Sequence, residues 1–212
     1  MLNRILLSGS ALLASACLAS AAQVLTQNND PALPFGDTGG AGIQNGAGFV
    51  NLGSFNDLSD GAIRALFDAG DRSGLNAAFL QFGATVDFAT PSAGGFDGVF
   101  NADVGQPIAP GDDLVGDDIF IVAGEGSSIL DASSLIIMRG INQFNFDDPA
   151  FATDAIAGEA GNTFIVGTNG NVNVPGVAEL PGILAERVIP EPSAAALLGL
   201  SAIGLALRRR RR

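Results

Sequence analysis

Short apolar runs, separated by glycine-rich and acidic stretches, make up most of the middle of the chain. Residues 119–122 and 135–138 are dense apolar runs, which predicts central strands of a sheet. Residues 84–88 alternate in polarity, and residues 48–53 form another short strand candidate. These four stretches therefore predict at least four strands.

The last third of the chain predicts a hairpin and a final strand. Asn169-Gly170 separates residues 163–166 from residues 172–174. Asn-Gly between two such stretches is the strongest short signal for a type I′ turn. Residues 183–188 predict the last strand.

Two helical patterns lie between the early strand candidates. Ser59 can cap a segment that ends at Gly70, with apolar residues spaced by three and four: Ile63, Leu66 and Phe67. A second segment repeats that spacing before Gly83: Leu75, Ala78, Phe79 and Phe82. Strands outnumber helices, so residues 23–189 should form a mainly β domain. We expect an antiparallel β-sandwich or barrel-like sheet with one or two short helices.

Residues 1–22 have the three parts of a secretory signal peptide. Arg4 gives the positive start, residues 5–18 are apolar, and small residues follow at positions 19–22. We expect a signal helix that is cleaved after Ala21 or Ala22. The alternatives are a buried helix and lipidation at Cys17.

The other end of the chain reads as a sorting and anchor segment, residues 190–212. Pro190, Glu191 and Pro192 precede an apolar run at residues 193–207, which a basic tail at residues 208–212 follows. As a helix, 15 residues cover about 22 Å, short of the roughly 30 Å hydrocarbon core. We expect a short transmembrane helix whose five arginines stay in the cytoplasm.

This C-terminal pattern closely resembles the PEP-CTERM sorting signal of Gram-negative bacteria. The resemblance implies an exosortase substrate, because an exosortase is a membrane-embedded cysteine transpeptidase thought to cut at such tails. It implies a route through the inner membrane to the cell surface or extracellular matrix. The alternative is an ordinary single-pass anchor.

The domain itself is similar to domains that precede such tails in Verrucomicrobia-like bacteria. The shared pieces are short: Gly53-Ser54-Phe55, then residues 79–83, then residues 118–122. That resemblance implies no particular activity.

The composition lacks most of the side chains that commonly act in catalysis. The sequence contains no His, Trp, Tyr or Lys, and its one cysteine, Cys17, lies in the signal peptide. The commonest general base and a thiol nucleophile are therefore missing, and we expect no enzyme activity and no cofactor. Residues 23–189 carry four Arg against 21 Asp and Glu, a net charge of −17, which repels nucleic acid.

Paired acids are the weak candidates for a metal site: Asp112, Asp113, Asp117 and Asp118. Clustered carboxylates could bind calcium, but the spacing is not that of a calcium-binding loop. Adjacent carboxylates in one strand also point to opposite faces. Solvated turn residues are the simpler interpretation.

The sequence therefore predicts an exported, non-enzymatic protein with a structural or interaction role in the extracellular polymer layer. The alternative is a calcium- or carbohydrate-binding surface module, and a secreted hydrolase is more remote. The expected partners are the secretion machinery and exosortase, the inner membrane as a transient anchor, and extracellular polysaccharide.

Overall fold

A six-stranded sheet forms the centre of the domain. The computed structural model describes residues 21–28, 33–90, 94–107, 113–144 and 153–189. The sheet has the order β12-β7-β6-β3-β4, and β9 also pairs with β7. Its strands are β3 (Gly48–Ser54), β4 (Leu80–Val86), β6 (Asp118–Glu125), β7 (Ser134–Gln143), β9 (Thr163–Val166) and β12 (Glu186–Arg187).

The two central strands are those that the apolar runs predict. β6 and β7 pair antiparallel along most of their length, and six consecutive residues of β6 and the first five of β7 are buried. Burial on both faces explains the runs, because a strand with one solvent face would alternate. This prediction is confirmed.

Two three-stranded sheets pack on one face of the central sheet. One has the order β5-β1-β8, from β5 (Asn101–Pro107), β1 (Ala21–Gln27) and β8 (Thr153–Ile156). The other has the order β10-β11-β2, from β10 (Thr168–Val174), β11 (Ala178–Leu184) and β2 (Phe35–Gly36). β1 pairs with β8, and β11 with β2, in parallel. The mainly β prediction is confirmed, but the sheets are not purely antiparallel and do not close into a barrel.

Two short helices cover the other face of the central sheet. α1 (Asp60–Asp68) begins as predicted, since the Ser59 Oγ accepts a hydrogen bond from the Ala62 N–H at 3.3 Å. Gly70, with φ of +72°, follows its end. α2 (Arg72–Ala78) is shorter than predicted. Phe82 and Gly83 instead belong to β4, where Phe82 lies opposite Leu52 and is fully buried.

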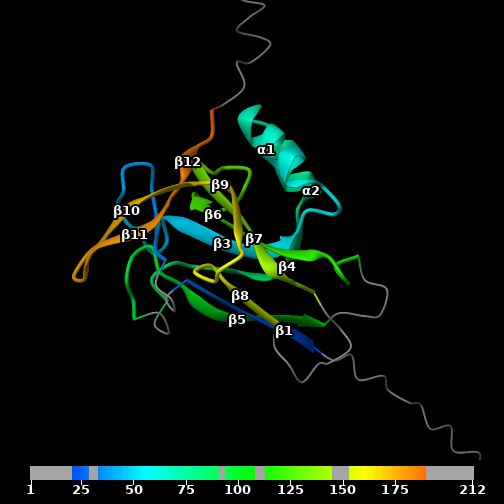
Figure 1. Cartoon of the computed structure of the whole chain (residues 1–212), viewed down its shortest axis with the longest axis horizontal. Helices are drawn as coiled ribbons and strands as arrows, with labels where there is room; N and C mark the ends of the chain where they lie inside the picture. The colour runs from blue at the N-terminus through cyan, green and yellow to red at the C-terminus, as the bar shows by residue number, and fades with distance from the viewer. Residues whose placement is uncertain (1–20, 29–32, 91–93, 108–112, 145–152, 190–212) are drawn as a thin grey trace, which may run out of the picture.

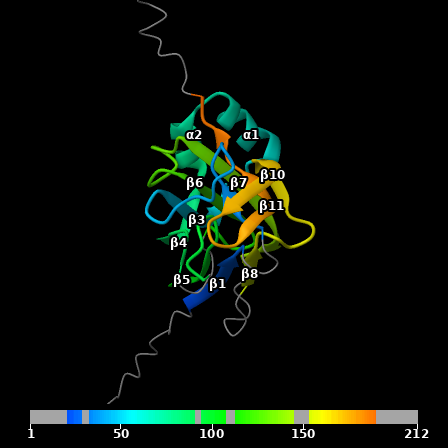
Figure 2. The same cartoon turned by 90° about the vertical axis from the view of Figure 1, so that its left-hand side faces the viewer.

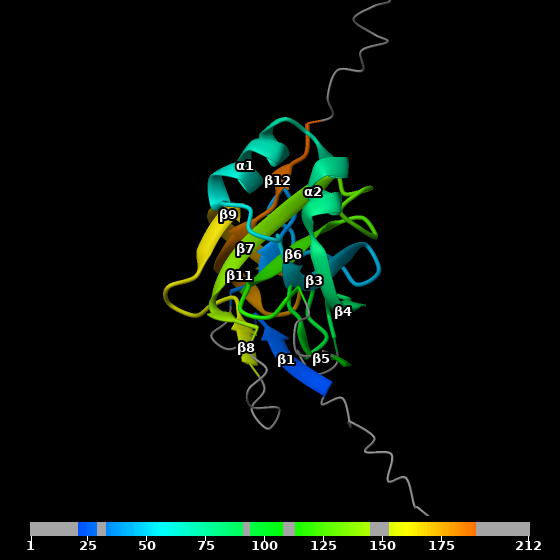
Figure 3. The same cartoon turned by 90° about the vertical axis from the view of Figure 1, so that its right-hand side faces the viewer.

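The central sheet separates two hydrophobic clusters, one on each of its faces. In β3, Val50 and Leu52 face the small sheets, while Phe49 faces the helices together with Ile63 and Phe67 of α1. The helices lie at the same end of the molecule as β12 (Figures 1 and 3). The cluster beneath them also contains Val188, which ties the end of the fold to the helical layer.

The predicted hairpin at Asn169-Gly170 is wrong. Both residues lie inside β10, opposite Ile183 and Gly182 of β11. The actual β10–β11 hairpin turns at residues 175–177, and Figure 2 shows it facing the viewer. Pairing along seven residues of β11 outweighs the local turn preference of Asn-Gly.

The two ends of the described chain lie at opposite ends of the molecule (Figures 1 and 3). β1 is at one end, and β12 and the helices are at the other. Ala21 and Ala22, the predicted cleavage residues, are the first residues of β1. The domain boundaries and the cleavage position stay predictions.

The predicted signal helix and short transmembrane helix fall on residues outside the described ones. Among the residues that the structure does describe, no helix is long and apolar enough to cross a membrane.

Candidate functional site

An acidic cavity of about 580 Å³ opens where the β3–α1 connection meets the start of β6. Among the described residues, four carboxylates line it, from Asp57, Asp60, Asp117 and Asp118, together with one cation, Arg139. The net charge of these five side chains is −3. The cavity therefore favours cations or neutral polar groups over anions.

Protein groups already engage most of these carboxylates. Arg139 donates to both oxygens of Asp60, from Nε at 3.0 Å and from Nη2 at 2.9 Å. Its Nη1 lies 3.4 Å from Asp118 Oδ2, and Gln143 donates to Asp118 Oδ1 at 2.9 Å. The Asp60 carboxylate, through its hydrogen bond and its charge, raises the pKa of Arg139, with a smaller contribution from Asp118.

Only two of the four predicted metal-site residues lie together in the structure. Asp117 and Asp118 lie together in the cavity, where Asp117 Oδ2 accepts from the Ser54 hydroxyl at 2.7 Å. Asp113 is exposed and does not line it, and Asp112 falls outside the described residues. Within the described part of the chain, no group of three or more His, Cys, Asp or Glu residues could hold a metal ion.

Sequence reasoning missed Asp57 and Asp60. Asn56 and Asp57 adopt φ values of 43° and 66°, and the Leu58 N–H closes this turn on the Phe55 carbonyl at 3.0 Å. Asn and Asp tolerate this left-handed region better than other side chains with a Cβ. The Ser59 cap places Asp60 in the first helical turn, but no local pattern pairs it with Arg139, 79 positions away.

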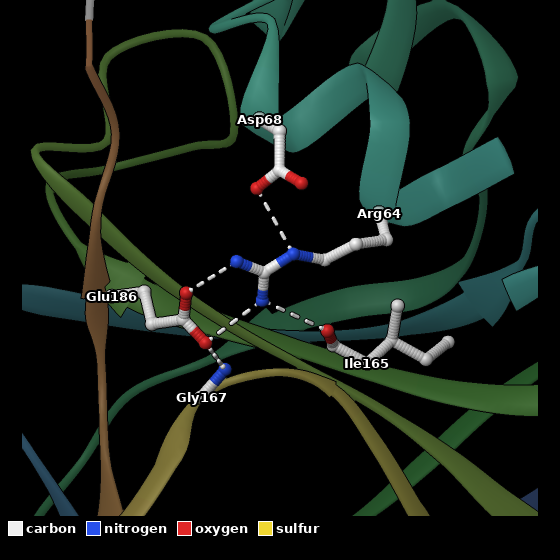
Figure 4. Close-up of polar contacts among 5 residues, drawn as sticks. All are labelled: Arg64, Asp68, Ile165, Gly167 and Glu186. Atoms are coloured by element: carbon white, nitrogen blue, oxygen red, sulfur yellow. Dashed lines mark hydrogen bonds and ion pairs between the residues drawn. The ribbon is translucent and has the colours of Figure 1, made fainter. Parts of the chain in front are cut away.

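A second polar cluster lies at the C-terminal end of the fold (Figure 4). Arg64 of α1 extends between Asp68, at 2.9 Å from its Nε, and Glu186 of β12. Its Nη1 and Nη2 reach the two Glu186 oxygens at 2.9 and 2.8 Å. The Gly167 N–H donates to the same carboxylate at 2.8 Å, and Arg64 also donates to the Ile165 carbonyl at 3.3 Å. We call these five residues the end clamp.

The end clamp favours the charged forms of Arg64 and Glu186. Burial acts to raise the pKa of Glu186, but hydrogen bonds from Arg64 and the Gly167 N–H outweigh it, so the pKa is lowered. The Glu186 and Asp68 carboxylates raise the pKa of Arg64. The pair is half-buried, with 38% of the Arg64 side chain and 20% of the Glu186 side chain exposed, so solvent screens part of the attraction.

The last described residues pass from the core to the surface next to the end clamp. The Val188 N–H donates to the Ser133 carbonyl at 3.0 Å, and the Val188 side chain is only 3% exposed. Ile189, the next residue, is 70% exposed. Beside the clamp, Ile189 and Glu186 line a smaller cavity of about 320 Å³. The transition from core to solvent therefore takes one residue.

The predicted sorting residues Pro190, Glu191 and Pro192 follow at once and lie outside the described residues. The apolar run at residues 193–207 and the basic tail at residues 208–212 are also outside. Their roles stay predictions of the sequence.

Comparison with known families identifies this end of the chain. The family described as the PEP-CTERM protein-sorting motif matches residues 188–211. Neither a curated protein nor a solved structure matches the chain. The similarity of the domain to those in Verrucomicrobia-like bacteria therefore stays a prediction.

Proposed function

We propose that this chain, which carries the PEP-CTERM protein-sorting motif, displays a non-enzymatic β-rich domain in the extracellular polymer layer. The motif marks an exported protein that a membrane-associated exosortase sorts to the cell surface. The role of the domain after export is the new part of the proposal. Its proposed partner is extracellular polysaccharide.

One observation carries the proposal: the fold and the motif meet at the same residue. Among the described residues, Val188 is the last one that is buried, and the motif match begins there. A cut beyond this point would release the whole domain, with both hydrophobic clusters complete. A domain that is complete without its tail suits a protein that leaves the membrane as a finished unit.

Composition and charge support a non-enzymatic role. The whole sequence lacks His and Lys, which removes two of the side chains that most often act as general bases. The net charge of −17 over residues 23–189 keeps neighbouring copies apart and soluble.

The acidic cavity supports a second candidate function, the binding of a cation or a carbohydrate. Its polar lining could contact sugar hydroxyls, and its net charge attracts calcium. Against this, Asp60, Asp117 and Asp118 already accept hydrogen bonds from protein groups. Of the described residues that line the cavity, the two aromatic ones, Phe55 and Phe120, are both buried and offer no exposed face for a sugar.

Fractionation of a doubly tagged precursor tests the proposal. One epitope enters the hairpin turn at Gly176, where an added Cβ would meet nothing within 4 Å, and the other follows Arg212. In a host with an exosortase, the first tag should leave the inner membrane without the second. In a host without one, and in Glu191→Ala, both tags should remain together in the membrane. A single chain that keeps both tags in the exosortase-bearing host would contradict the proposal.

Probing the exported layer then tests the domain's role. Purified domain should bind extracellular polysaccharide from the native host and should show no hydrolysis of it. Release of sugar products would favour the hydrolase instead. Binding that requires calcium would favour the second candidate function.

A further inference from the structure

We propose that β12 is a gate for exosortase: residues 186–188 must leave the fold before the tail can be cut, and the Arg64–Glu186 ion pair sets how often they do. This inference rests on the proposed function. The chain itself then controls how fast it is released from its tail. The chemistry of the cut belongs to exosortase and is unchanged.

The gate follows from the short distance between the core and the motif. Val188 is buried and bonded to Ser133, and only Ile189 separates it from Pro190. Two residues span at most about 7 Å even when fully extended. Recognition of an extended peptide uses its backbone hydrogen bonds and pockets for alternate side chains, so it needs several neighbouring residues of free chain. A folded domain that begins 7 Å away leaves little chain for such contacts.

β12 is the part of the fold that can supply the missing length. It is only two residues long and lies at the edge of the central sheet, paired with β7 through Glu186–Leu135 and Arg187–Ser134. The strand before it, β11, pairs over seven residues with β10. The Ala185 N–H also donates to the Gly36 carbonyl at 2.8 Å. Opening therefore has a natural stop at Ala185, and short edge segments open at lower free energy than core strands.

The end clamp is the main polar resistance to that opening. Glu186 accepts hydrogen bonds from two nitrogens of Arg64 and from the Gly167 N–H, and all of these are lost when β12 leaves. Arg64 itself is held in place by Asp68 and by packing of its guanidinium over the Phe67 ring, 5.3 Å from the ring centroid. The guanidinium is thus already positioned for the Glu186 carboxylate, which favours the closed state.

Arg64→Met in the full-length precursor tests the gate. Methionine keeps the apolar stem and removes the guanidinium. Cleavage of a transiently opened segment tracks the population of the open form when opening is fast. Loss of a half-exposed ion pair should raise that population, and with it the rate of tail removal in a pulse-chase experiment, about fivefold. The precursor is expressed in the exosortase-bearing host.

Arg139→Met is the matched control. It removes a similarly exposed ion pair that also involves α1, between Arg139 and Asp60, but one that does not contact β12. We expect it to leave the cutting rate unchanged. Equal acceleration by both variants would mean that global stability governs access, and would overturn the gate.

A linker separates the gate from other effects of Arg64. Six Gly and Ser residues between Ile189 and Pro190 should give exosortase enough free chain without opening β12. The wild type and Arg64→Met should then be cut at the same fast rate. A fivefold difference that persists with the linker would overturn the gate, and so would a wild type that the linker does not accelerate.

Two further measurements test the gate even if Arg64→Met folds poorly. Glu186→Gln weakens the clamp from the other side and should also accelerate cutting. Hydrogen exchange at the Val188 amide should rise in both variants while exchange in β6 stays constant. Unchanged exchange and unchanged cutting would overturn the gate. A wild-type precursor that is never cut, or is cut without exosortase, would instead refute the proposed function.

Discussion

Shortening the chain from its C-terminal end should show where the cooperative fold stops. Two purified forms are compared, one that spans residues 22–189 and one that spans residues 22–185. The longer form corresponds to the domain that the proposed tail removal would leave. The shorter form lacks Glu186, Val188 and the exposed residues beside them, but keeps every other strand.

The structure gives the size of the expected loss. Burial of the Val188 side chain contributes about 1.5–3 kcal/mol. The half-exposed Arg64–Glu186 pair adds less than about 1 kcal/mol after solvent screening. The Val188 hydrogen bond to Ser133 contributes about 1 kcal/mol. Together these terms amount to about 3–5 kcal/mol, which corresponds to a fall in Tm of about 10 °C for a domain of this size.

Thermal unfolding followed by circular dichroism measures the difference. The form ending at Ile189 should melt at the same temperature as a form that continues through Pro192, because Ile189 is already exposed. The form ending at Ala185 should melt about 10 °C lower. Equal melting temperatures for the forms ending at Ala185 and Ile189 would refute the reasoning, since β12 and Val188 would then contribute nothing to the fold.

Three other predictions concern the cavity, the sheet and the clamp. Millimolar calcium should raise Tm no more than sodium at matched ionic strength. A saturable rise that is lost on changing Asp117 and Asp118 to Asn would contradict this. Gly53→Ala should destabilise the domain by about 1–3 kcal/mol in urea unfolding, because its Cβ would meet the Leu80 carbonyl oxygen. The control Gly61→Ala, in the open face of α1, should be neutral or stabilising, and equal losses in both would be inconsistent with a contact at position 53. The pKa of Glu186 is lowered in the folded state, so its stabilisation is complete above its unfolded pKa of about 4.3 and is lost as the pH falls through the folded value. The Tm difference between the wild type and Glu186→Gln should therefore shrink between pH 7 and pH 3, and a constant difference would argue against the ion pair.

The sequence by itself determined the features that depend on neighbouring residues. Residues 119–122 and 135–138 predict β6 and β7, because strands buried on both faces must be apolar at every position. Ser59 predicts the start of α1, because capping joins a side chain to an amide three positions away. The PEP-CTERM motif is equally local, a run of consecutive residues whose order alone identifies it.

The tertiary structure decided the contacts between residues that lie far apart in the sequence. Asn169-Gly170 does not form the turn that its local preference favours, because it pairs with β11 instead. Seven paired residues stabilise the fold more than a single favoured turn would. Phe82, which fits a helical spacing, lies in a strand because its side chain completes the core opposite Leu52.

The same reason explains the two polar clusters. Arg139 meets Asp60 across 79 positions, and Arg64 meets Glu186 across 122. In an acidic chain with few cations, each Arg has many possible partners, and charge alone does not select one. Sheet order and the packing of α1 select them, because these bring only certain carboxylates within reach of each guanidinium. The sequence thus predicts the sorting motif at this end of the chain, and the tertiary structure decided which contacts hold the last described residues in place.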